Sequence, residues 1–164
     1  MMISLTYFLK LTAFVAATAF VVEGQSETHT VTFQNLCSTG VPTLKTYNGE
    51  ILSTGPAYTS NGSLIAAIAY LDVGCGAKGE GCTLIETTLV NPASPGTGSS
   101  TDINLIPPHS FSVPSGFWYY NGCDGHGANC TDADCPSAFH SSTEGGVGIV
   151  CLAENVNLAI TFCN

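Results

Sequence analysis

Basic side chains are almost absent from this chain. Its 164 residues include no arginine and only three lysines against twelve acidic residues, which gives a formal net charge of −9. Such a surface repels phosphate, so the composition argues against nucleic-acid partners and anionic membranes. An uncharged polymer such as a glycan fits this charge balance, although simple solubility would also account for it.

Long apolar runs are scarce as well. The one run, residues 11–22, follows Lys10 and is too short for a comfortable membrane span, which indicates a secretion signal. Val22 and Gly24 occupy the −3 and −1 positions and predict cleavage before Gln25, with an uncleaved anchor as the alternative. We expect residues 1–24 to be a signal peptide and residues 25–164 to form one soluble secreted domain without a membrane partner.

Free thiols are not expected either. All eight cysteines follow the predicted cleavage site, and an even number in a secreted chain predicts four disulfides. A zinc site is the competing interpretation, but the oxidising secretory pathway disfavours it. The cysteines are Cys37, Cys75, Cys82, Cys123, Cys130, Cys135, Cys151 and Cys163.

Two alternating segments frame the domain. Residues 156–163 place large apolar side chains at every second position, which is typical of a strand that covers a core. Residues 30–37 show the same alternation, and both segments end in a cysteine. A disulfide from Cys37 to Cys163 would join the two ends of the domain, whereas two unrelated strands with other partners is the alternative.

Most of the remaining chain has the features of short strands. Asn48-Gly49 predicts a hairpin between residues 43–47 and 51–53. Residues 63–71 allow a helix, but their length and flanking glycines favour a buried strand. Only residues 132–140 have helical character. Further strands are predicted at residues 83–90, 101–106 and 147–151, and residues 117–120 supply aromatics. Roughly nine short strands separated by turns indicate an all-β sandwich.

Two sequons could carry N-linked glycans. Asn61-Gly62-Ser63 lies in a polar turn, so we expect Asn61 to be glycosylated. Asn129-Cys130-Thr131 also fits the pattern, but a disulfide at Cys130 would crowd it, and the sequence leaves the state of Asn129 open.

Several short segments follow one another in a characteristic order: residues 29–37, 83–86, 102–105, 111–114, the cysteines at 123, 130 and 135, and residues 160–163. In this order they resemble thaumatin-like proteins over nearly the whole of residues 25–164. The likeness is greatest to compact secreted members of fungi that are labelled only as glycopeptides. The resemblance implies a two-sheet β-sandwich stapled by disulfides. By analogy, Cys37 pairs with Cys163, Cys75 with Cys82, and Cys123 with Cys151, which leaves Cys130 for Cys135.

The resemblance also implies a site. Larger thaumatin-like proteins have an acidic cleft associated with β-glucan binding and sometimes hydrolysis, and Glu86 and Asp102 match two of its carboxylates. A further cleft Asp falls near Pro107 here, and the cleft Arg has no counterpart. If Glu86 and Asp102 lie on neighbouring strands they form a candidate catalytic pair. If the chain is an enzyme, we expect Glu86, between Ile85 and Thr87, to be partly buried and to act as the acid, with Asp102 hydrated and charged. Two solvated strand carboxylates without a catalytic role is the favoured alternative.

Metal sites are less well supported. His126, Asp132, Asp134 and His140 crowd the cysteine-rich segment and could bind a divalent ion, but the two aspartates more simply serve as turn and cap residues. His29 would become a copper ligand only if cleavage occurred after Thr28, which is a poor −1 residue. We therefore expect no metal and no cofactor.

The sequence predicts a secreted, non-catalytic protein that acts at the cell wall or outside the cell, with β-glucan as its candidate ligand. The enzyme alternative is a weak β-1,3-glucanase that uses Glu86 and Asp102, disfavoured because the cleft Arg and the second cleft Asp are missing. A third class is a structural or effector-like protein without a glycan ligand. We expect a monomeric glycoprotein with no nucleic-acid partner.

Overall fold

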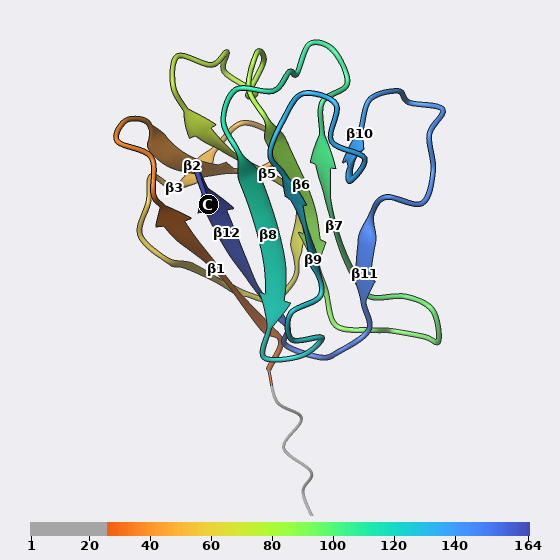
Figure 1. Ribbon diagram of the computed structural model, residues 1–164. Helices are drawn as coiled ribbons and strands as arrows, with labels where there is room; N and C mark the ends of the chain where they lie inside the picture. Colours follow the sequence, from red (N-terminus) through yellow and green to blue (C-terminus); the bar gives the residue numbers. More distant parts are fainter. Residues whose placement is uncertain (1–25) are drawn as a thin grey trace, which may run out of the picture.

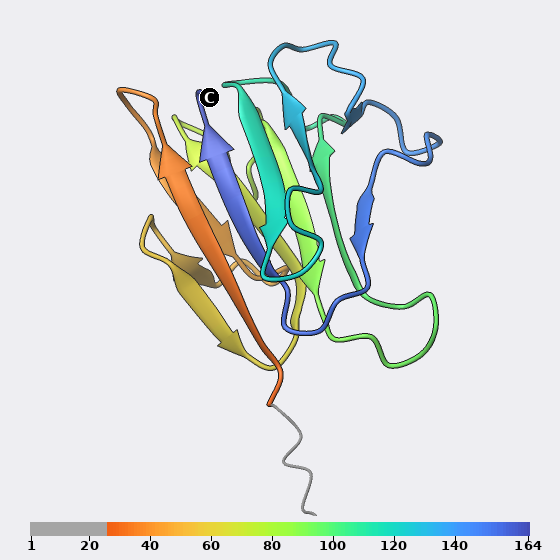
Figure 2. The ribbon, with the colours of Figure 1, turned by 60° about the horizontal axis from the view of Figure 1, so that its bottom comes forward.

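The chain folds into two β-sheets packed face to face (Figures 1 and 2). The computed structural model describes residues 26–164, so the predicted signal peptide and the cleavage before Gln25 lie outside the described residues. Every regular element from residue 26 onward is a strand, as the all-β prediction requires. The strands are β1 Thr28–Asn35, β2 Val41–Lys45, β3 Ile51–Ser53, β4 Tyr58–Asn61, β5 Leu64–Asp72, β6 Leu84–Leu89, β7 Ser99–Asn104, β8 Ser115–Tyr120, β9 Gly127–Cys130, β10 Ala138–Phe139, β11 Ile149–Cys151 and β12 Asn157–Phe162.

The first and last strands lie side by side. The five-stranded sheet has the order β4-β1-β12-β8-β9, and β1 pairs with β12 in parallel, with Val31 opposite Leu158 and Phe33 opposite Ile160. Figure 2 shows β1 in orange, β12 in blue and β8 in teal as neighbours. The alternating side chains predicted for residues 156–163 are confirmed as core residues, since Val156, Leu158, Ile160 and Phe162 are all fully buried.

The second sheet contains the remaining seven strands. Its order is β10-β7-β6-β5-β2-β3, and β11 also pairs with β7. The predicted hairpin is confirmed, because β2 and β3 pair in antiparallel fashion around a turn in which Gly49 takes a positive φ of 90°. Residues 64–72 form strand β5 rather than a helix, and Ala67, Ala69 and Leu71 lie in the core on its inner face.

All four disulfides form the pairs that the resemblance implied. Cys37 joins Cys163 with a Cα–Cα distance of 5.2 Å, across a sequence separation of 126 residues. The bridges Cys75–Cys82, Cys123–Cys151 and Cys130–Cys135 close shorter loops, and the described chain has no free cysteine.

The helix predicted for residues 132–140 is wrong. Asp132 accepts hydrogen bonds from the backbone N–H groups of Asp134 and Cys135, which makes two tight turns, and Phe139 then pairs with Asn104 of β7. Pro136 lacks an N–H group and clashes with a preceding helical turn. The Cys130–Cys135 bridge also holds this segment in a tight loop. Residues 26–164 contain no helix long and apolar enough to cross a membrane.

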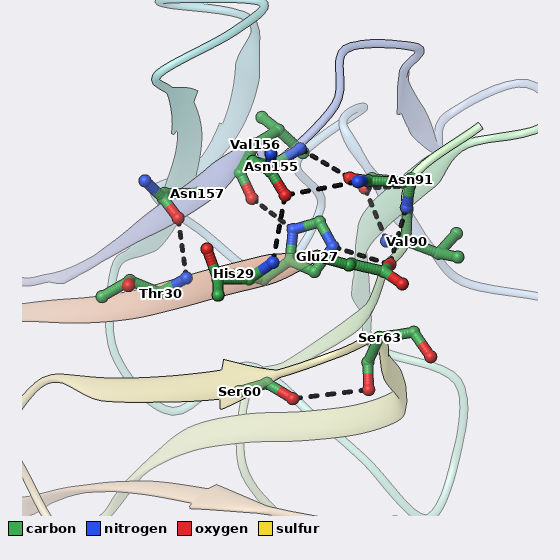
Figure 3. A network of polar contacts seen from close by, with 12 residues as sticks. Glu27, His29, Thr30, Ser60, Ser63, Val90, Asn91, Asn155, Val156 and Asn157 are labelled. Carbon is green, nitrogen blue, oxygen red and sulfur yellow. Dashed lines mark hydrogen bonds and ion pairs between the residues drawn. The ribbon is translucent and has the colours of Figure 1, made fainter. Parts of the chain in front are cut away.

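A polar network fastens the start of β1 to the sheet (Figure 3). His29 is fully buried, with Nδ1 2.7 Å from the Val156 carbonyl oxygen and Nε2 3.0 Å from Glu27 Oε1. The Asn91 backbone N–H donates to the same Glu27 oxygen at 2.8 Å. That bond, followed by the contact with His29, lowers the pKa of the Glu27 carboxyl. The network therefore keeps the Glu27 carboxyl ionised and ties the start of β1 to Asn91 and Val156.

Candidate functional site: an acidic groove on the seven-stranded sheet

Glu86 and Asp102 stand directly opposite each other. Glu86 of β6 is in register with Asp102 of β7, and with Ile68 of β5 on its other side. The adjacent row, which includes Ile85 and Ile103, is fully buried between the sheets. Since side chains alternate along a strand, Glu86 and Asp102 point to the outer face of the sheet. The condition that the two carboxylates lie on neighbouring strands is met.

The two carboxylates lie on the floor of a groove that crosses β5, β6 and β7. Three adjoining depressions, with volumes of about 280, 300 and 130 Å³, all include Glu86, and the two larger ones also include Asp102. The lining side chains are Tyr47, Ala66, Ile68, Lys78, Thr88, Ser100, Asn104, Ile106, His109, Phe139, Ser141, Ser142 and Glu144, among others.

A bulge shapes one bank of the groove. The register between β5 and β6 shifts between Leu64 and Ala67, and Ala66 takes a positive φ of 49°. Its backbone N–H donates to Thr88 Oγ1 at 3.0 Å, which fixes that hydroxyl group at the groove wall. The small Ala66 side chain leaves the floor beside Glu86 open.

The Asp102 carboxyl has a raised pKa, which was not expected. Burial raises the pKa of the Asp102 carboxyl from 3.8 to about 7, and the adjacent charge of Glu86 contributes further. Asp102 is thus the group that holds a proton near neutral pH. The expectation that Asp102 would be hydrated and charged is wrong.

Lys78 brings a positive charge to the groove. It lines the smallest of the three depressions together with Glu86, and its Nζ lies 5.8 Å from the centroid of the Tyr47 ring. Lys45, the other lysine of residues 26–164, lies with its Nζ 5.6 Å from the centroid of the Tyr70 ring and donates to the Ala77 carbonyl oxygen at 2.7 Å. The smallest depression therefore combines a carboxyl group with an ammonium group.

Tyr47 is a site residue that the sequence analysis did not single out. Its side chain is 70% exposed, and it lines two of the three depressions. It follows β2 at the start of the Asn48-Gly49 turn, so the turn projects the ring over the outer face of the sheet. An aromatic residue next to a strong hairpin signal was the available clue, but its proximity to Glu86 depends on pairing across three strands.

The two metal hypotheses receive no support. Residues 26–164 hold no group of three or more His, Cys, Asp or Glu side chains that could bind a metal ion. His140 Nε2 instead contacts the Cys135 carbonyl oxygen at 2.9 Å, and Asp132 serves as a turn residue. The ring nitrogens of His29 are both engaged inside the protein, with the Val156 carbonyl oxygen and with Glu27.

The two sequons lie on opposite edges of the five-stranded sheet. Asn61 ends edge strand β4, and Asn129 belongs to edge strand β9. Both side chains are exposed. Glycosylation of Asn61 and Asn129 stays a prediction.

The fold and its four bridges define a class: a disulfide-stapled β-sandwich of two sheets with a groove on one outer face. Within that class the chain has the thaumatin-like fold. A thaumatin-like xylanase inhibitor, one of 13 matching chains of solved structure, superposes with a TM-score of 0.52 at 16% sequence identity, covering 83% of this chain and 99% of that chain. No family model and no curated protein matches the sequence.

Proposed function

We propose that this protein is secreted and binds an uncharged β-glucan of the cell wall in the groove of Glu86 and Asp102, without cleaving it. The observation that carries the proposal is the direct opposition of the two carboxyl groups on the floor of an open groove. Below about pH 7 the protonated Asp102 carboxyl can donate a hydrogen bond, and the side-chain oxygens of Glu86 beside it can accept one. Such a pair suits neighbouring hydroxyl groups of one sugar, and the Tyr47 ring offers an apolar surface for the C–H face of the next.

Hydrolysis is the second candidate, and one observation favours it. A protonated Asp102 beside Glu86 supplies the acid and the carboxylate that glycoside hydrolysis needs, with the two expected roles exchanged. Directly opposed strand residues have Cβ atoms about 4.5–5.5 Å apart, near the carboxyl separation of about 5–5.5 Å in retaining enzymes. Against this candidate, the chain contains no arginine to orient a substrate, and Pro107 occupies the region of the second cleft Asp.

Calorimetric titration with a soluble β-1,3-linked glucose hexamer tests the proposal, with release of reducing sugar measured in the same samples. We expect binding that weakens about tenfold in Glu86→Gln or Asp102→Asn, the loss of roughly one good polar contact. Glu154→Gln is the matched control, because it removes an exposed carboxylate from the turn before β12. Tyr47→Ala should also weaken binding.

Three outcomes separate the function classes. Binding without sugar release supports the proposal. Sugar release that falls a hundredfold or more in either carboxyl variant would establish the glucanase, since general acid–base catalysis alone contributes about that factor. The absence of binding would favour a structural or effector-like protein without a glycan ligand.

A further inference from the structure

The outer face of the five-stranded sheet carries no charge. The outward positions of its strands hold threonine, asparagine, glutamine, glycine, alanine and two aromatic residues. The chain has eleven acidic residues after position 25, yet none of them occupies an outward position on this sheet. The outward residues are Thr28, Thr30, Thr32 and Gln34 of β1, Thr59 and Asn61 of β4, Gly116, Trp118 and Tyr120 of β8, Gly127 and Asn129 of β9, and Asn157, Ala159 and Thr161 of β12.

Trp118 stands at the centre of one row on this face. Its register neighbours are Ala159 of β12 and Gly127 of β9, both small, so no large side chain flanks the indole. The adjacent Phe117 and Tyr119 are buried in the core, whereas Trp118 is only half-buried. A shallow depression of about 220 Å³ lies beside it, lined in part by Gly125, Gly127 and Ala128. The only tryptophan of the chain therefore lies on the outer face of the sheet with small side chains on both neighbouring strands.

Hydroxyl groups extend this surface across β1. Thr28, Thr30 and Thr32 occupy successive outward positions, and Thr30 Oγ1 lies 2.8 Å from Thr59 Oγ1. The Thr30 backbone N–H donates to Asn157 Oδ1 at 2.7 Å, which holds the neighbouring amide in place (Figure 3). The polar groups next to Trp118 are thus numerous, uncharged and fixed in position by the sheet.

We propose that this face is a second binding surface, which docks the protein onto an insoluble, uncharged polysaccharide with Trp118 as its anchor. An uncharged, flat occupant is favoured because the face offers no ion-pair partner, while the rest of the molecule would repel an anionic one. The C–H face of a pyranose ring packs on an indole, and ordered hydroxyl and amide groups bond the ring hydroxyls. The face lies on the opposite side of the sandwich from the groove, so the two surfaces act independently.

Asn129, one of the two predicted glycosylation sites, lies beside Trp118. It shares the depression with Trp118, and its Oδ1 lies close above Gly116, where an added Cβ would meet it at 2.7 Å. A glycan on Asn129 would occupy the space beside the indole. Removing that glycan should therefore leave polymer binding unchanged or strengthen it. Asn61 lies at the diagonally opposite corner, opposite Thr28.

The experiment is a depletion isotherm of the secreted protein on insoluble β-1,3-glucan and on amorphous cellulose. We expect the parent protein and Asn129→Gln to bind, and Trp118→Ala to bind about tenfold more weakly, a change of about 1.4 kcal/mol. Trp118→Phe should keep most of the affinity. Leu152→Ala, which truncates an exposed apolar residue outside this face, is the matched control and should bind like the parent. Ala159→Lys places a long charged side chain between Thr32 and Trp118 and should also weaken binding, which keeps the test valid if Trp118→Ala fails to fold.

Several results would overturn the proposal. Equal binding of the parent, Trp118→Ala and Ala159→Lys to the insoluble polymer would contradict it. The absence of binding both with and without the Asn129 glycan would contradict it as well. Binding that falls steeply between about 0.05 and about 0.5 M salt would indicate charge pairing rather than a neutral interface. If Trp118→Ala instead converts a dimer to a monomer without changing polymer binding, the face serves a second copy of the chain. Trp118→Ala should leave the calorimetric titration with the soluble hexamer unchanged, because Trp118 lies outside the groove, so failure of the groove hypothesis is separable from failure of this one.

Discussion

Asp102 and Glu86 carry the same functional group on neighbouring strands, and both are half-buried. Asp102 lies on β7 between the residues that pair with β10 and those that pair with β11, and a Cβ added at Gly148 would lie 4.0 Å from its Cβ. Desolvation therefore raises the pKa of Asp102 to about 7, with the charge of Glu86 as the smaller cause. Glu86 is half-buried, but its neighbours Ile85 and Thr87 point to the opposite face of the sheet and are not what covers it. No local pattern shows that residues 149–151 return beside Asp102.

The raised pKa of Asp102 predicts a dependence of stability on pH. A carboxyl whose folded pKa lies above its unfolded value stabilises the fold below about pH 4, and this contribution is lost as the pH rises towards 7. Asp102→Asn should therefore be more stable than the parent at pH 8, by at most about 4 kcal/mol, and similar to it at pH 4. Urea unfolding at both pH values measures the difference. A variant that is less stable than the parent at pH 8 would show that the carboxylate is compensated in the folded state.

At the scale of elements, alternation, β-branched residues and flanking turn residues identified several strands well. Strands β5, β6, β7 and β12 lie within a residue or two of the predicted ranges, because each must bury one face against the other sheet. The helix at residues 132–140 failed for a long-range reason, since pairing of Phe139 with Asn104 decides that segment. The same contrast between local and long-range information holds for the groove. Glu86 and Asp102 were identified from the family resemblance, whereas the place of Tyr47 beside them depends on the order of the strands in the sheet.

One buried chain of hydroxyl groups links the two sheets and can be tested. The Tyr119 hydroxyl lies 2.9 Å from Thr101 Oγ1 and 3.0 Å from the Ile149 carbonyl oxygen, and Thr87 Oγ1 lies 2.7 Å from Thr101 Oγ1. Burial raises the pKa of the Tyr119 phenol to about 12. Tyr119→Phe should cost about 1–3 kcal/mol of unfolding free energy, because it leaves buried polar groups without a partner.

The matched control for that change is Tyr120→Phe, which removes a hydroxyl from the half-buried outer side of the same strand. Its effect should stay within about 0.5 kcal/mol. Denaturant unfolding of both variants measures the two changes. Equal effects would mean that the link between the sheets contributes nothing to stability.

At the scale of the whole molecule, the Cys37–Cys163 bridge should dominate the disulfide contribution. In the chain-entropy model a loop of 126 residues is worth about 5 kcal/mol and one of seven residues about 2.4 kcal/mol. Replacing Cys37 and Cys163 by serine should therefore destabilise the domain about 2–3 kcal/mol more than the same change at Cys75 and Cys82. Thermal unfolding of the two double variants measures this difference, and the reverse order would contradict it.

Peptide mapping without reduction checks the bridges themselves. It should find no free thiol and should link Cys37 to Cys163. A bond from Cys37 to Cys75 or Cys82 would be incompatible with the sheet order described above.

The parallel pairing of β1 with β12 also bears on how the protein is made. β12 is synthesised after the other eleven described strands, and it occupies the middle of the five-stranded sheet, between β1 and β8. During synthesis, β1 emerges more than a hundred residues before its partner and must wait with one edge unpaired. Pairings between such distant segments form slowly and expose unpaired strand edges in the meantime. A chain that stops before residue 156 lacks β12, so β1 and β8 have no strand between them. We therefore expect truncation just before β12 to prevent folding as fully as truncation earlier in the chain.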